Sequence, residues 1–147
     1  MTFDPADAAW LADARAPLSP EGQTAHALVI HADRDLRDML DMYLLSAGYV
    51  VSAAPDGPAA SRQLGERVPD LIVLDTSVSK LEDLEFIHAE PARRGQFIPV
   101  LFLTEEKAVA ERAEGLGMIA CLTQPFSPDR FLKSALRCLR GSEALVN

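Results

Sequence analysis

The chain has 147 residues, which fits one domain with a substantial core and leaves no room for a second. Its composition, 48% hydrophobic and 24% charged, is typical of a globular protein. A formal net charge of -8 would repel a nucleic-acid backbone, so we expect no nucleic-acid partner. The apolar runs are far shorter than the ~20 residues that cross a bilayer, and the N-terminus lacks a signal-like pattern. We therefore expect no membrane partner and a cytoplasmic location.

The first residues differ in character from the rest of the chain. Residues 5–15 (PADAAWLADAR) could form a short helix, and a polar stretch follows them. We expect residues 1–25 to be an N-terminal extension, 26–140 to be the domain, and 141–147 to be a tail or the start of a linker.

From residue 26 onward, short apolar runs alternate with segments of helical periodicity, which predicts an α/β fold with a parallel sheet. Five runs are strand candidates: 26–32, 49–54, 70–75, 98–104 and 119–123. The first, third and fourth are rich in β-branched and aliphatic residues, as is typical of central strands buried on both faces.

Helix start and stop signals lie between these runs. Asp33 can cap the first helix and Gly48 can close it. Further helices are expected to begin at 56–58, to span 84–90 and 105–114, and to begin at Ser127 with Pro128.

In an open parallel sheet, ligands bind beyond the carboxyl ends of the strands. That edge should present His31, Ala32, Asp33, Asp75, Thr104 and Gln124. Asp75 is the strongest candidate, because it directly ends the apolar run LIVL at the rim of a buried strand. The alternative is a simple turn or cap role.

The sequence resembles the receiver domain of bacterial two-component response regulators over roughly residues 26–140. The resemblance rests on PDLIVLD at the third strand, PVLFLT at the fourth, LTQPF after the fifth (usually LTKPF), and DG before the second helix. It implies a flavodoxin-like, doubly wound, five-stranded parallel sheet of order 2-1-3-4-5, with helices on both faces. It also implies transfer of a phosphoryl group from a histidine kinase to an aspartate with the help of Mg2+. Such a protein is not an enzyme beyond its own phosphorylation.

The resemblance makes Asp75 the phosphoacceptor and Thr104 the switch hydroxyl. Other positions depart from the family pattern: the acidic pair that holds Mg2+ falls on His31 and Ala32, the lysine on Gln124, and the aromatic switch residue on Cys121.

These departures weaken the chemistry. Mg2+ takes oxygen ligands in an octahedron, so an imidazole and a methyl group leave Asp75 nearly alone to hold it. A charge-assisted bond to phosphate is worth about 1.5 to 3 kcal/mol, so Gln124 in place of lysine could cost about 10- to 100-fold in rate. We therefore expect weak Mg2+ binding, no other cofactor, and little or no phosphorylation.

Three of these side chains have two interpretations each. Asp33 could help to hold the metal or cap the first helix. His31 could be a pH-sensitive partner of Asp75 or a neutral histidine that fills the former metal pocket. Thr104 could keep the switch role or be a β-branched strand residue bonded to nearby backbone.

The fifth helix carries a basic stripe, and the fourth is acidic. The residues concerned are Arg130, Lys133, Arg137 and Arg140 on the fifth helix, and Glu111 and Glu114 on the fourth. In the family these helices often form a symmetric dimer face, so a homodimer is expected there. The alternative is a solvated surface, since exposed ion pairs contribute only ~0 to 1 kcal/mol each.

Three functions follow. We favour a protein-interaction module that works with a sensor histidine kinase or a downstream signalling protein. The second is a working phosphoacceptor on Asp75. The third, a flavodoxin or a hydrolase that uses Ser77 with His31, is disfavoured, because the acidic loop HADRD cannot cradle a flavin phosphate and no G-x-S-x-G motif occurs.

Overall fold

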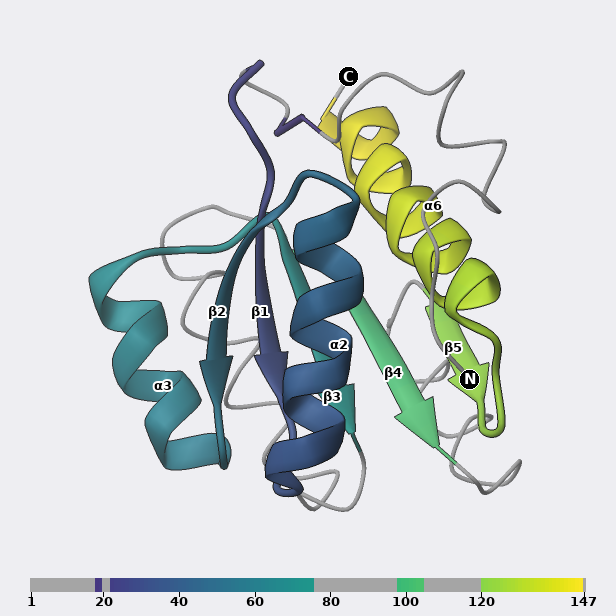
Figure 1. Ribbon diagram of the computed structural model, residues 1–147. Coiled ribbons are helices and arrows are strands. Elements are labelled where there is room, and N and C mark those ends of the chain that lie inside the picture. The colour runs from purple at the N-terminus through teal and green to yellow at the C-terminus, as the bar shows by residue number, and fades with distance from the viewer. Residues whose placement is uncertain (1–17, 20–21, 76–97, 105–119, 147) are drawn as a thin grey trace.

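The computed structural model describes residues 18–19, 22–75, 98–104 and 120–146. Its strands are β1 (His26–Ile30), β2 (Val50–Ala54), β3 (Leu71–Asp75), β4 (Val100–Thr104) and β5 (Ala120–Thr123). Its described helices are α2 (Arg34–Ser46), α3 (Gly57–Glu66) and α6 (Pro128–Val146). All strand pairs are parallel, and the order is β2-β1-β3-β4-β5 (Figure 1).

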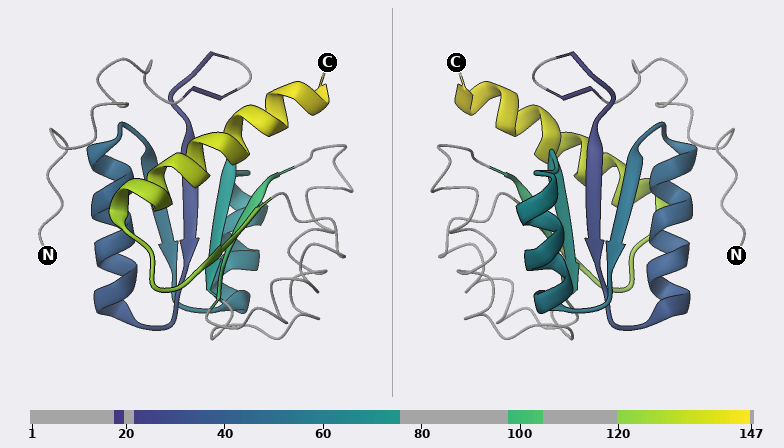
Figure 2. Two further views of the ribbon diagram at one scale, coloured as in Figure 1. Left: turned by 90° about the vertical axis from the view of Figure 1, so that its right-hand side faces the viewer. Right: turned by 90° about the vertical axis from the view of Figure 1, so that its left-hand side faces the viewer.

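The sheet separates two layers of helices (Figure 2): α2 and α6 cover one face and α3 covers the other. Successive residues of β1 join different cores, since Ala27 and Val29 pack on the α2/α6 side and Leu28 and Ile30 on the α3 side. Every residue of β1, β3 and β4 is buried. This two-sided burial explains why these strands are continuous apolar runs.

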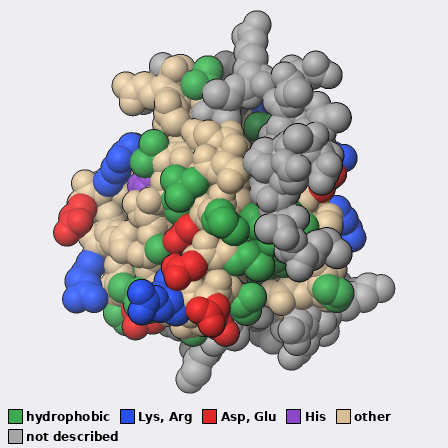
Figure 3. Space-filling view, viewed as in Figure 1, with side chains coloured by type: hydrophobic (Ala, Val, Ile, Leu, Met, Phe, Trp, Pro, Cys, Tyr) green, Lys and Arg blue, Asp and Glu red, His purple; other side chains and the backbone are tan. Residues whose placement is uncertain are grey.

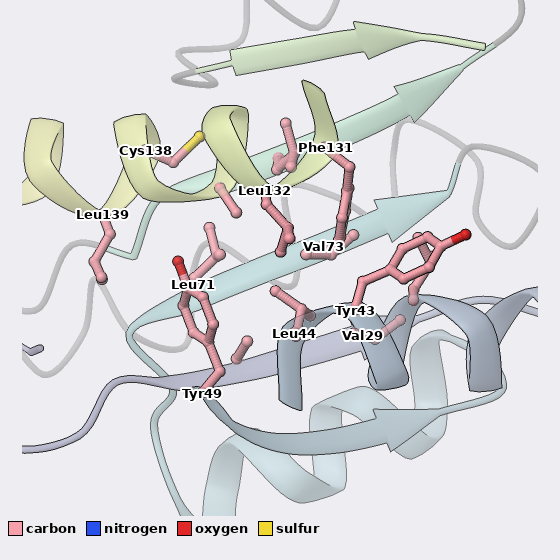
Figure 4. Packing of buried hydrophobic residues seen from close by; sticks show 14 of the residues in the cluster. Val29, Tyr43, Leu44, Tyr49, Leu71, Val73, Phe131, Leu132, Cys138 and Leu139 are labelled. Atoms are coloured by element: carbon pink, nitrogen blue, oxygen red, sulfur yellow. The ribbon is translucent and has the colours of Figure 1, made fainter. Parts of the chain in front are cut away.

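Side chains from α2 and α6 converge on β3 (Figure 4). Leu44 of α2 and Leu132 of α6 are buried in the same cluster as Val73 of β3. The Tyr43 and Phe131 rings lie 6.3 Å apart between centroids, which ties α2 directly to the first turn of α6. Cys138 and Leu139 of α6 lie in the same cluster beside Leu71, so α6 packs on the sheet from its first turn onward.

Helix α2 is amphipathic, with Leu40, Tyr43 and Leu44 buried. It ends at Ser46 with Ala47 as its C-cap, and Gly48 follows with a φ of 98°, a left-handed conformation that glycine adopts without strain. Its outer face also exposes Met42 and Leu45, and Figure 3 shows hydrophobic side chains gathered over this helix.

The fold class and strand order predicted from the sequence are confirmed. The expected helices at 84–90 and 105–114 lie outside the described residues. Helix α6 continues to Val146, through most of the segment 141–147 that we expected to be a tail, while the domain boundaries stay a prediction. Among the described helices, none combines the length and the apolar character that a membrane span requires.

Candidate functional site

Strand register brings His31 and Asp75 together. Parallel strands β1 and β3 are neighbours, and Ile30 pairs with Leu74. One residue further along each strand, His31 lies opposite Asp75, and alternation directs both side chains to the face covered by α2 and α6. Side chains opposite each other on adjacent strands lie close enough to interact.

The His31 imidazole contacts the Asp75 carboxylate directly. Nε2 of His31 lies 2.8 Å from Oδ2 of Asp75, and the two side chains are only 5% and 8% exposed. The other ring nitrogen, Nδ1, accepts a hydrogen bond of 3.0 Å from the backbone N–H of Asp33. An accepting Nδ1 carries no proton, so this imidazole is neutral and its Nε2–H donates to Asp75.

This geometry also argues against a hydrolase. Both ring nitrogens of His31 are engaged within the fold, so neither is placed to accept a proton from a hydroxyl nucleophile. Ser77, the expected nucleophile of that alternative, lies outside the described residues.

Gln124 is a second donor to Asp75. Its side-chain Nε2 donates to Oδ2 of Asp75 over 3.2 Å, and its backbone N–H donates to the carbonyl oxygen of Thr104 over 2.8 Å. Two N–H groups, one from His31 and one from Gln124, therefore share one carboxylate oxygen. The position where the family has a lysine still carries a donor, but a neutral one.

The residues at the family's metal positions do not fit Mg2+. His31 directs an N–H at Asp75, and Ala32 offers only a methyl group. Oδ1 of Asp33 accepts from the backbone N–H groups of Asp35 and Leu36, so this carboxylate caps α2. A hard ion needs several oxygen ligands, and the described residues contain no group of three or more acidic, histidine or cysteine side chains placed to hold a metal ion.

Arg37 belongs to this site, although we did not expect it there from the sequence. Its Nη1 donates to the carbonyl oxygen of His31 over 2.8 Å. Because Arg37 lies four residues after Asp33, it sits one helical turn from the cap and reaches back to the end of β1. That spacing, i and i+4 from the cap residue, is the signal that could have identified it.

Thr104 and Cys121 are the residues that the family resemblance puts at the two switch positions. Thr104 is 1% exposed at the end of β4, and alternation places its side chain on the same side of the sheet as Phe102. Cys121 is half-buried and packs against that same cluster. The switch role of Thr104 stays a prediction.

The described residues include only part of the predicted interface. Arg130, Lys133, Arg137 and Arg140 are exposed along α6. Lys133 also pairs with Asp129 one turn earlier, with Nζ 3.3 Å from Oδ2. Glu111 and Glu114 lie outside the described residues, so pairing between the two helices stays untested.

The sequence model of the family described as "Response regulator receiver domain" matches residues 27–136. The chain belongs to this family, the receiver domains of response regulators in two-component signalling. Receiver domains are generally not enzymes, and self-phosphorylation of Asp75 stays a prediction.

Individual relatives agree with this assignment. The chain is 34% identical over 118 residues to response regulator MprA of Mycobacterium ulcerans, which covers 79% of this chain and 50% of that protein. It is 35% identical over 114 residues to transcriptional regulatory protein TctD of Salmonella typhimurium, covering 76% and 50%. The solved structure of chemotaxis protein CheY4 of Vibrio cholerae superposes with a TM-score of 0.68 at 28% identity, covering 78% of this chain and 98% of that one.

These relatives correct one expectation. TctD, and YrkP of Bacillus subtilis, are transcriptional regulatory proteins by name, so our exclusion of a nucleic-acid partner was wrong. The chain spans about half the length of the curated relatives it matches. A net charge of -8 describes this chain alone, and the charge of one segment does not decide what a longer protein binds.

Proposed function

We propose that this receiver domain works as a protein-interaction module with little or no phosphorylation of Asp75. The observation that carries the proposal is the 2.8 Å contact between His31 Nε2 and Asp75 Oδ2. A neutral N–H group stands where the family uses acidic side chains to hold a metal.

Phosphoryl transfer depends on positioning and on neutralising the charge of the moving oxygens. In this pocket both described donors to Asp75, His31 and Gln124, are neutral, and Ala32 supplies no ligand. Moving His31 aside breaks a buried hydrogen bond, which costs about 1 to 3 kcal/mol. That cost alone slows phosphorylation about 5- to 160-fold, before the loss of the metal and of the lysine is counted.

The second candidate is a working phosphoacceptor that a histidine kinase phosphorylates on Asp75. Two observations favour it: Asp75 ends the buried strand β3, and Thr104 ends its neighbour β4. A carboxylate and a hydroxyl at the ends of adjacent strands are what the family resemblance implies for an acceptor and a switch residue, and this supports the second candidate.

Acetyl phosphate with Mg2+ separates the two candidates. We expect no Asp75-dependent phosphorylation of the wild-type chain by intact-protein mass spectrometry, with Asp75→Ala as the control. A variant that combines His31→Asp, Ala32→Asp and Gln124→Lys restores the family's residues and should become phosphorylated on Asp75. Wild-type phosphorylation as extensive as that of the restored variant would establish the second candidate instead.

Beryllofluoride, a phosphoryl analogue, tests the same point without chemistry. With Mg2+ and beryllofluoride, the backbone NMR signals of Asp75, Thr104 and Gln124 should stay unchanged in the wild type and shift saturably in the restored variant. Saturable wild-type shifts that Asp75→Ala abolishes would overturn the proposal.

A further inference from the structure

A histidine beside an aspartate at the carboxyl edge of a sheet is, by residue type, a potential site for a divalent ion such as Zn2+. An imidazole nitrogen and a carboxylate oxygen are both common ligands of Zn2+ and Co2+. A pocket that had merely lost its acidic ligands for Mg2+ could therefore still bind Zn2+ through His31 and Asp75.

Metal binding by a histidine determines which of its two ring nitrogens carries the proton. The nitrogen that binds the ion must be unprotonated, and the other then carries the proton and donates to a carboxylate, a carbonyl or water. His31 has the reverse arrangement, because its Nδ1 faces a donor, the backbone N–H of Asp33, at 3.0 Å. The proton lies on Nε2, which faces Asp75.

We infer that the backbone N–H of Asp33 fixes the tautomer of His31 and thereby closes the Asp75 site to divalent metal ions, Zn2+ and Co2+ included. This inference rests on the proposed function and names the hydrogen bond that keeps metal ions out of the site. Binding an ion through Nε2 would move the proton to Nδ1, where two N–H groups would then point at each other in a buried space.

The surroundings prevent the imidazole and the amide from turning apart. Asp33 is the N-cap of α2, and its carboxylate holds the first backbone N–H groups of the helix. On the other side, Arg37 Nη1 donates a hydrogen bond of 2.8 Å to the carbonyl oxygen of His31. The His31 residue is 4% exposed, so water cannot easily replace either partner. The tautomer is thus set by the helix cap, and Asp33 acts as a positioning residue through its backbone.

The wild-type protein gives the first test. Long-range 1H–15N NMR of 15N-labelled chain should show His31 Nδ1 as an unprotonated nitrogen and Nε2 as a protonated one. Titration with Zn2+ should leave both signals unchanged. A protonated Nδ1, or a saturable Zn2+ shift at His31 that Asp75→Asn abolishes, would overturn the inference.

Two variants of Asp33 isolate the backbone group. The φ of Asp33 is -77°, within the range that proline adopts, so Asp33→Pro removes the N–H without forcing this dihedral. Asp33→Ala is the matched control, because it loses the same capping carboxylate but keeps the N–H. On the scale of outer-shell effects on metal sites, we expect Asp33→Pro to bind Zn2+ about 10- to 100-fold more tightly than Asp33→Ala.

The new Zn2+ site must depend on Asp75, so adding Asp75→Asn to Asp33→Pro should abolish it. Equal Zn2+ affinities of the proline and alanine variants would contradict the inference. If Asp33→Pro fails to fold, the tautomer of the wild type still decides the question.

The inference and the proposed function fail in different ways. Zn2+ binding by wild-type His31 would overturn the inference and leave a receiver that is still not phosphorylated. Phosphorylation of wild-type Asp75 with Mg2+ would overturn the proposed function, whatever tautomer the NMR experiment shows.

Discussion

The side-chain amide of Gln124 lies 3.2 Å from Oδ2 of Asp75, so a residue that follows β5 is bonded to the residue that ends β3. The backbone N–H of Gln124 donates to the Thr104 carbonyl, which adds the end of β4 to the same connection. The charge of the side chain at position 124 should therefore act directly on the Asp75 carboxylate.

The effect of a Gln124 substitution on stability should depend on the sign of the charge that the new side chain carries. Gln124→Glu places a second carboxylate against Asp75 and should lower the free energy of unfolding by about 1 to 3 kcal/mol, because a donor is lost and like charges meet. Gln124→Lys keeps a donor and adds a positive charge, so it should be at least as stable as the wild type. Urea unfolding at pH 7.5 measures both. Equal stability of the two variants would contradict the contact.

His31 and Asp75 should be energetically coupled. Removing either side chain breaks the buried hydrogen bond between them, so each of His31→Ala and Asp75→Ala should lower the free energy of unfolding. The double variant should lose less than the sum, and a double-mutant cycle in urea should give a coupling of about 0.5 to 3 kcal/mol. Additive losses would show that the bond contributes nothing to stability.

Asp41 on α2 should make stability depend on pH. Burial, and next the Asp38 carboxylate, raises the pKa of Asp41 from 3.8 to about 6, while Arg37 opposes the shift. Since the folded pKa lies above the unfolded one, this group stabilises the fold below about pH 4, and its contribution is lost as the pH rises through 6. Asp41→Asn should therefore raise the free energy of unfolding at pH 7.5 and have little effect at pH 4.

The control for this prediction is Asp35→Asn, which changes an exposed carboxylate of the same helix. It should give no stabilisation that appears between pH 4 and pH 7.5. A gain from Asp41→Asn that is equal at both pH values would argue against titration of Asp41 as its cause.

The protein should be more stable with phenylalanine than with tyrosine at position 49. The residue is 4% exposed, its buried hydroxyl has no hydrogen-bond partner among the residues that the structure describes, and burial raises the pKa of this hydroxyl above its usual range. An unpartnered buried hydroxyl costs about 1 to 3 kcal/mol, so Tyr49→Phe should raise the free energy of unfolding by about 1 kcal/mol. Tyr43→Phe is the control, because Tyr43 carries no buried unpartnered hydroxyl. A loss of stability in Tyr49→Phe would reveal a partner of that hydroxyl.

The fold could be predicted because local pattern and burial agree. The run LIVL before Asp75 is apolar at every position, as a strand covered on both faces requires, and the structure buries all of it. Asp33 was a recognisable cap, and its carboxylate does accept the first N–H groups of α2. Strand burial and helix capping both depend on residues that are close together in the sequence, so sequence patterns can predict them.

The internal arrangement of the site could be predicted only in part. His31 was expected near Asp75 with two interpretations, and the choice between them depends on the direction of one backbone N–H, which no residue type encodes. Gln124 was interpreted as a lost lysine, and its bond to Asp75 follows from strand register rather than from its identity. Arg37 was overlooked, because an arginine on a helix is most often a solvated surface residue.

The length of α6 has a mechanical consequence. Its 19 residues form one rod about 28 Å long, which starts four residues after Gln124 and is held at its first turn by contacts of Phe131 with Tyr43 and Phe126. Helix α6 is buried in the core at Phe131, Leu132, Ala135, Cys138 and Leu139. The short segment that carries Gln124 is therefore attached to a helix that the core fixes over more than two turns, which limits how far the Gln124 amide can move away from Asp75.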